Sequence, residues 1–131
     1  MNKENIKKIQ DRILELLPKN RRSEKSALLE YSCSELSRLV ASWIKESEKN
    51  IHCFILKGDD VCGTQKSHDI LVVIDENNKI YVIDPTIWQF FPDEKSILIG
   101  KFNSLNASII ATEEKYGGGW KISEDLKNIS R

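Results

Sequence analysis

Hydrophobic residues recur at a helical spacing in the first third of the chain and at a strand-like spacing afterwards. Between residues 4 and 17, isoleucine and leucine return every three or four positions, which predicts an amphipathic helix that ends before Pro18. A second helical pattern extends from about residue 24 to residue 48. Serines on both sides of Cys33 are natural N-cap residues, so we expect a fresh helix to begin near that cysteine.

Beyond residue 50 the chain becomes rich in β-branched and apolar residues, which alternate with polar loops. Four runs predict strands: "IHCFILKG" from residue 51, "HDILVVI" from residue 68, "KIYVI" from residue 79 and "SILIGKF" from residue 96. The next run, "SIIATEEKY" from residue 108, fits either a fifth strand or a short helix. The glycines at 117–119 predict a flexible loop, and a short polar helix is expected from Ser123.

The order of these elements, helices first and consecutive strands later, predicts an α+β fold in which N-terminal helices pack on an antiparallel β-sheet. At 131 residues the chain is long enough for one domain with its own core and too short for two. We divide this single domain into an N-terminal helix and connector at 1–22, a nucleophile helix region at 23–48, an antiparallel sheet at 51–112, and a glycine-rich loop and tail at 113–131.

The second and third predicted strands form a hairpin whose register the sequence leaves open. A two-residue turn places His68 and Asp84 on opposite faces of the sheet. A three-residue turn, with Asn78 in the left-handed region, pairs Asp75 with Lys79 and makes His68 and Asp84 diagonal neighbours on one face. Both faces of the hairpin are apolar, so the hydrophobic pattern does not decide between the two turns.

Composition narrows the class of protein without naming a function. Twenty basic and twenty acidic residues cancel, and no basic face is implied, which argues against a nucleic-acid partner. We see no signal peptide, and no apolar run approaches the roughly 20 residues that span a bilayer. Three cysteines are an odd number, so a disulfide scaffold is not expected and a reducing compartment such as the cytoplasm fits better.

One cysteine, one histidine and one aspartate stand at the ends of predicted elements. Cys33 lies at a helix start, where free backbone N–H groups and the helix dipole favour a thiolate and can support an oxyanion. His68 would take the thiol proton, and Asp84 would fix the tautomer of the imidazole and stabilise its charged form. This pattern predicts a cysteine nucleophile that needs neither a cofactor nor a metal.

The segments "CSELSRLVASWIKE", "SHDILVVI" and "KIYVIDPTIW", in this order, resemble the core of the transglutaminase-like and papain-like cysteine enzymes. In that superfamily a nucleophilic cysteine begins a helix that packs on an antiparallel sheet, a histidine begins one strand, and an aspartate ends the next. Cys33, His68 and Asp84 fall on those positions, and the similarity covers about residues 30 to 90. The compact spacing also resembles bacterial toxin or effector domains that deamidate glutamines in host proteins.

The resemblance implies a papain-like or transglutaminase-like fold and a hydrolase that forms a thioester with a carboxamide. The first expectation is deamidation of a glutamine in a target protein, by a domain that acts in the cytoplasm or is delivered into a target cell as an effector. The partner would then be a protein or peptide that presents a glutamine. A cysteine peptidase or cell-wall amidase with the same triad is one alternative, and a non-catalytic binding or immunity-like module of the same fold is another.

Residues that would contact the substrate or the oxyanion are less clearly marked. Papain-type enzymes carry a glutamine shortly before the nucleophile, whereas "SALLEYSC" has none, and Gln65 is the substitute that the chain offers. Ser32 and Ser34 flank the nucleophile. Trp88 is a candidate for the aromatic residue that transglutaminases have near the active cysteine.

The remaining candidates have plainer interpretations. Cys53 lies in an apolar strand and is expected in the core, while Cys62 is a loop thiol and a weaker alternative nucleophile. A zinc site made from the histidines and cysteines between residues 52 and 68 is disfavoured because no Cys-x-x-Cys pair exists. Phe90 and Phe91 follow the aspartate and either join the core or line an acyl-binding groove.

Overall fold

A computed structural model describes residues 1–16 and 33–127, and it confirms an α+β fold with an antiparallel sheet. Five strands lie in the order β4-β3-β2-β1-β5, and each neighbouring pair is antiparallel. Within these two described ranges, three α-helices and two short 3₁₀ turns accompany the strands. In chain order the elements are α1 (Lys3–Leu14), α2 (Cys33–Ser47), β1 (His52–Asp59), η3 (Val61–Gly63), β2 (His68–Ile74), β3 (Ile80–Ile83), η4 (Ile87–Gln89), β4 (Leu98–Phe102), α3 (Leu105–Tyr116) and β5 (Gly119–Asp125).

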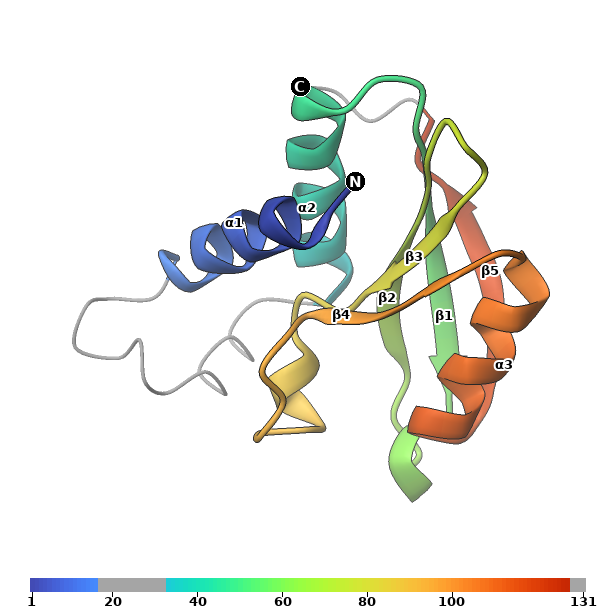
Figure 1. Cartoon of the computed structure of the whole chain (residues 1–131). Coiled ribbons are helices and arrows are strands. Elements are labelled where there is room, and N and C mark those ends of the chain that lie inside the picture. Colours follow the sequence, from blue (N-terminus) through green and yellow to red (C-terminus); the bar gives the residue numbers. More distant parts are fainter. Residues whose placement is uncertain (17–32, 128–131) are drawn as a thin grey trace.

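The sheet is covered on both faces. Helices α1 and α2 lie on one side of it and α3 lies on the other (Figure 1). The first side buries Cys53, Ile55, Leu71 and Val73 against the helical stripes, and the second buries alternate strand residues such as Leu56 and Ile70 with the aromatic rings near α3. Because both faces are covered, the central strands read as continuous apolar runs rather than as an alternating pattern.

The two N-terminal helices follow the predicted stripes. In α1 the side chain of Asn2 accepts a hydrogen bond from the backbone of Asn5 at 2.9 Å, which caps the first turn. Its buried isoleucines face the core. Helix α2 spans Cys33–Ser47. Ser32 lies outside the described residues, so the helix start expected from the flanking serines stays a prediction. Helix α1 ends at Leu14, short of the predicted limit near residue 17. The predicted helical segment at 24–32 lies outside the described residues.

The third helix and the fifth strand correct the sequence predictions. Residues 105–116 form α3, so the helical alternative holds for "SIIATEEKY". Its buried face contains Ser108, Thr112 and Tyr116, and the hydroxyls of the first two bond to helix carbonyls, so the apolar periodicity that marks a helix is weak. The polar helix expected from Ser123 is wrong, because residues 119–125 form β5 along the edge of β1. The sheet therefore extends beyond the predicted limit of residue 112.

The hairpin adopts the three-residue turn. The backbone N–H of Asp75 donates to the carbonyl of Lys79 at 3.0 Å, and Asn78 has a left-handed φ of 61°. The carboxylate of Asp75 accepts from the N–H groups of Asn77 and Lys79 and holds the loop closed. Val72 therefore pairs with Val82, which places His68 and Asp84 on the same face.

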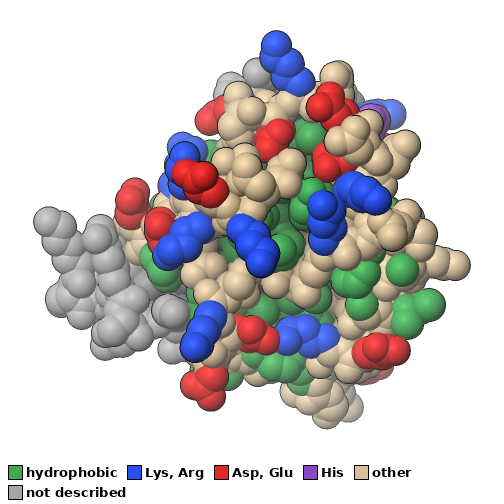
Figure 2. Space-filling model, viewed as in Figure 1, with side chains coloured by type: hydrophobic (Ala, Val, Ile, Leu, Met, Phe, Trp, Pro, Cys, Tyr) green, Lys and Arg blue, Asp and Glu red, His purple; other side chains and the backbone are tan. Residues whose placement is uncertain are grey.

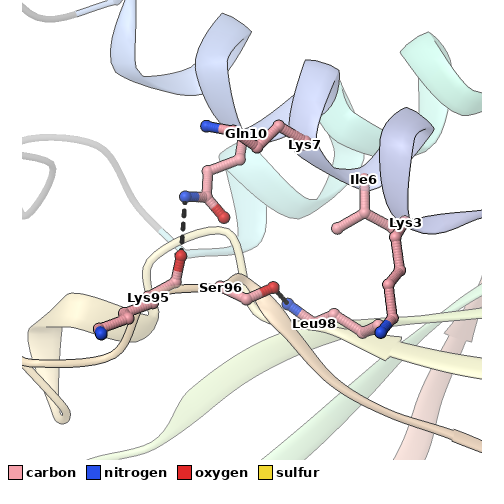
Figure 3. Close-up of a pocket in the computed structure, with 7 residues that line it drawn as sticks. All are labelled: Lys3, Ile6, Lys7, Gln10, Lys95, Ser96 and Leu98. Carbon is pink, nitrogen blue, oxygen red and sulfur yellow. Dashed lines mark hydrogen bonds between the residues drawn. The ribbon is translucent and has the colours of Figure 1, made fainter.

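A cavity of about 400 Å³ lies between α1 and the segment that leads into β4 (Figure 3). Its wall includes Gln10, whose amide donates to the carbonyl of Lys95 at 3.0 Å and accepts from the N–H of Ile97 at 3.1 Å. The carbonyl of Ile97 in turn accepts from the N–H of Asp84 at 2.8 Å. Gln10 thus stabilises the backbone at residues 95–97, to which Asp84 is hydrogen-bonded.

Replacing Gln10 with leucine is expected to lower the free energy of unfolding by about 1–3 kcal/mol, because the N–H of Ile97 loses a buried partner. Urea denaturation followed by circular dichroism measures the change. Lys8→Met, on the exposed face of the same helix, is the control and should shift stability by less than about 0.5 kcal/mol. Equal changes in the free energy of unfolding in the two variants would show that the hydrogen bonds of Gln10 do not stabilise the fold.

The surface matches the neutral composition. Lysine and arginine side chains mix with aspartate and glutamate over the face shown in Figure 2, without a large area of either sign. Among the described residues, none of the helices combines the length and the apolar character needed to cross a bilayer.

Candidate active site

His68 and Asp84 form a buried pair on the α3 side of the sheet. His68 is the first residue of β2, and Asp84 directly follows β3. Nε2 of the imidazole donates to Oδ2 of the carboxylate at 2.8 Å. The two residues are 1% and 0% exposed, so water does not screen their interaction. The diagonal contact expected from the three-residue turn is therefore present.

The carboxylate of Asp84 is saturated with hydrogen-bond donors. The hydroxyl of Tyr116 donates to Oδ2 at 2.5 Å, beside the imidazole. Oδ1 accepts from the backbone N–H of Thr86 at 3.0 Å and from its hydroxyl at 3.3 Å. An ionised carboxylate only accepts hydrogen bonds, so these donors together fix both of its oxygens in place.

Sequence reasoning missed both of these supporting residues. Thr86 had a readable signal, since an aspartate commonly accepts from the backbone two residues later. Tyr116 had none, because it lies 32 residues from Asp84 at the end of α3. Burial and the adjacent Asp84 carboxylate raise the pKa of its phenol far above the usual value, so Tyr116 remains a donor.

Aromatic rings hold the imidazole in one orientation. Phe90 packs edge-on against His68 with ring centroids 4.8 Å apart, and Tyr116 and Trp120 lie at 5.8 and 6.3 Å. Gly58 lies opposite His68 in the sheet, and a Cβ atom there would fall 2.4 Å from the Trp120 ring. Glycine at this position therefore gives the indole room to pack beside the histidine.

Cys33 lies beside the start of β2. It is the first residue of α2, its side chain is partly buried, and its sulfur accepts from the backbone N–H of Asp69 at 3.3 Å. The position at the helix N-terminus and the hydrogen bond from Asp69 hold the sulfur in a fixed place. Asp69 directly follows His68, so the thiol lies next to the residue that the sequence pairs with it.

The second ring nitrogen of His68, Nδ1, differs from Nε2 in its hydrogen bonding. Nδ1 is buried and has no hydrogen-bond partner of ordinary geometry among the described residues. Burial favours the neutral imidazole, but the Asp84 carboxylate and the Cys33 sulfur outweigh it and raise the pKa of His68 to about 9. This direction of the shift favours the charged imidazole, whose Nε2 is held by Asp84.

The other residues expected at the site lie in different surroundings. Ser34 accepts from Nε of Arg38 at 3.4 Å, and Gln65 is exposed in the loop before β2. Trp88 is buried and its indole donates to the carbonyl of Glu94 at 2.7 Å, so it has almost no surface to offer a substrate. Ser32 lies outside the described residues.

The two remaining cysteines stand apart from this chemistry. Cys53 is fully buried in β1, as expected, and burial raises its pKa to about 11. Cys62 is exposed in η3, and partial burial also raises its pKa. Within residues 1–16 and 33–127, no group of three or more histidine, cysteine or acidic side chains is placed to hold a metal ion.

No protein-family model matches the chain, and searches of curated proteins and of solved structures return no match. Any functional conclusion therefore rests on the geometry of the described residues.

Proposed function

We propose that the chain is a cysteine-dependent hydrolase that acts on carboxamides through Cys33, His68 and Asp84, and that its substrate is a glutamine side chain in a target protein. The orientation of His68 carries the proposal. Its Nε2 is bonded to a saturated carboxylate. Its buried Nδ1 has no hydrogen-bond partner within the described part of the chain, and it belongs to the residue that precedes the N–H in contact with the Cys33 sulfur. A purely structural histidine would be expected to satisfy both nitrogens.

The proposed reaction starts from a thiolate at Cys33 and an imidazolium at His68. The Cys33 thiolate attacks the carboxamide carbon and forms a C–S bond, and the first-turn N–H groups of α2 are available to the developing oxyanion. As the C–N bond breaks, the His68 imidazolium gives its proton to the leaving nitrogen, and ammonia departs. The neutral imidazole then takes a proton from water while the hydroxyl attacks the thioester. Cleavage of the C–S bond releases the acid and restores the ion pair.

The raised pKa of His68 suits this sequence, because an amide nitrogen must be protonated to leave. Asp84 keeps the imidazolium in one orientation and stabilises its charge without taking the proton. Tyr116 and Thr86 hold the carboxylate in turn. The buried rings around His68 exclude water from the pair, which strengthens these interactions.

A mass measurement tests the activity. Incubation of the protein with glutamine-bearing target proteins and peptides should convert an amide to an acid and release ammonia. Cleavage of the peptide backbone instead would identify a peptidase. Cys33→Ser is the matched variant and should show neither product. Turnover that persists in Cys33→Ser would contradict the proposed nucleophile.

Iodoacetamide labelling separates a thiol enzyme from a non-catalytic module of the same fold. Cys33 is expected to react at least about tenfold faster than Cys62 near pH 7, because in the proposed mechanism His68 takes its proton, whereas burial raises the pKa of the other thiol. Peptide mapping of the alkylated chain gives the two rates. His68→Gln should remove the difference. Slow labelling at Cys33, no faster than at Cys62, would support a binding module.

A further inference from the structure

An open groove of about 430 Å³ adjoins the proposed site. It follows η4 and is lined by Phe90, Phe91, Pro92, Asp93 and Glu94. The sequence left it open whether the two phenylalanines join the core or line a groove. Both are partly exposed and both line this cavity.

The groove and the candidate active site share a wall. The ring of Phe90 packs against the imidazole of His68 at 4.8 Å, and Phe91 packs against Tyr116 at 5.0 Å. One side of each phenylalanine thus contacts a residue of the proposed catalytic pair or its support, while the ring also borders the groove. A side chain bound in the groove would be separated from His68 by a single ring.

The groove already contains the chemistry that holds a cation. The ammonium of Lys115 lies 4.4 Å from the centre of the Phe91 ring and pairs with Glu94 at 2.5 Å. An aromatic face combined with a carboxylate is a favourable setting for a lysine or arginine side chain. Lys115 comes from α3, so this part of the chain binds its own cation at one end of the groove.

A second carboxylate in the groove, that of Asp93, has no ion-pair partner among the described residues. Asp93 is exposed and makes no ion pair with any described residue. Lys95 is close in sequence but forms no ion pair with Asp93, and it is its backbone carbonyl that bonds to Gln10 in the cavity beneath α1 (Figure 3). The groove therefore presents the ring of Phe90, which borders the active site, together with an exposed carboxylate that forms no ion pair within the described residues.

We infer that this groove binds a lysine or arginine side chain of the target protein, close to the glutamine that reacts at Cys33. The inference rests on the proposed function and adds a substrate class to it: a glutamine in a basic segment. Phe90 and Phe91 would contact the alkyl stem, and Asp93 would pair with the charge. An apolar or acidic side chain beside the glutamine would not form the ion pair with Asp93.

Competition between peptides tests the preference. A set of short glutamine peptides would carry one arginine, leucine or glutamate at each of the three positions on either side of the glutamine. At one position we expect kcat/KM to be about tenfold higher for arginine than for leucine, and lower still for glutamate. Asp93→Asn should reduce the value for the arginine peptide to that for leucine. Glu76→Gln, the same loss of charge at the exposed hairpin turn, should leave the preference intact.

Three outcomes would overturn the inference: equal kcat/KM for all three peptides, a preference for leucine, or an arginine preference that survives in Asp93→Asn. A binding measurement keeps it testable if no peptide is deamidated. In the Cys33→Ala variant, an arginine peptide without glutamine should shift the NMR signals of Phe90 and Phe91, and Asp93→Asn should weaken that binding. Binding of the arginine peptide without turnover of any glutamine peptide would contradict the proposed hydrolase activity and support the groove as a binding site. Turnover without binding at Phe90 and Phe91 would contradict the role of the groove and leave the proposed activity standing.

Discussion

Asp84→Asn is expected to slow attack by Cys33 on a carboxamide by about 10³–10⁴-fold while the protein stays folded. The asparagine side chain has nearly the same shape, but it is neutral, so the His68 imidazolium loses its stabilising charge. Its NH₂ group would also compete as a donor where His68 and Tyr116 now both donate. The imidazole would then be held in the wrong tautomer, or its tautomer would no longer be fixed by a hydrogen bond.

The measurement combines glutamine turnover with the alkylation rate of Cys33, and circular dichroism reports the fold. Asp75→Asn is the matched control, because Asp75 also accepts backbone hydrogen bonds but lies in the hairpin turn. It should alter stability without changing either rate. Alanine is unsuitable at position 84, since the donors left unpaired there would cost at least about 3 kcal/mol. A folded Asp84→Asn variant with wild-type rates would leave the proposed pair without a catalytic role.

Alkaline conditions are expected to weaken the fold through His68. Its pKa is raised to about 9, above the value of about 6.5 for an unfolded chain. The folded state therefore holds this proton more tightly than the unfolded state does. The stability it contributes is fully present below about pH 6.5 and is lost as the pH rises through about 9. A shift of this size corresponds to about 3 kcal/mol in the free energy of unfolding.

Urea denaturation between pH 6 and 10 measures this loss, and NMR follows the imidazole signal directly. The His52→Gln variant leaves His68 as the single histidine of the chain. Cys33→Ala removes the titration of the thiol, and a smaller loss is expected there because the sulfur also raises the pKa of His68. In Asp84→Asn most of the pH dependence should disappear. An imidazole that titrates near pH 6.5 in the wild-type protein would contradict the ion pair.

Local spacing along the chain determined most of the secondary structure. The isoleucines of α1 and the stripe of α2 recur at helical intervals, because a helix places residues three and four positions apart on one face. The four strands at 52–59, 68–74, 80–83 and 98–102 were likewise visible as apolar runs. These features are set within a few residues, so a single sequence is enough to read them.

Contacts between distant segments decided the rest. The faces of the hairpin could not be assigned from the sequence, because helices cover both sides of the sheet and remove the alternation that would reveal its register. β5 forms by pairing its backbone with β1, which no local pattern records. For the same reason the sequence could nominate Cys33, His68 and Asp84, whereas only the packed chain brings Tyr116 to the carboxylate and Phe90 to the imidazole.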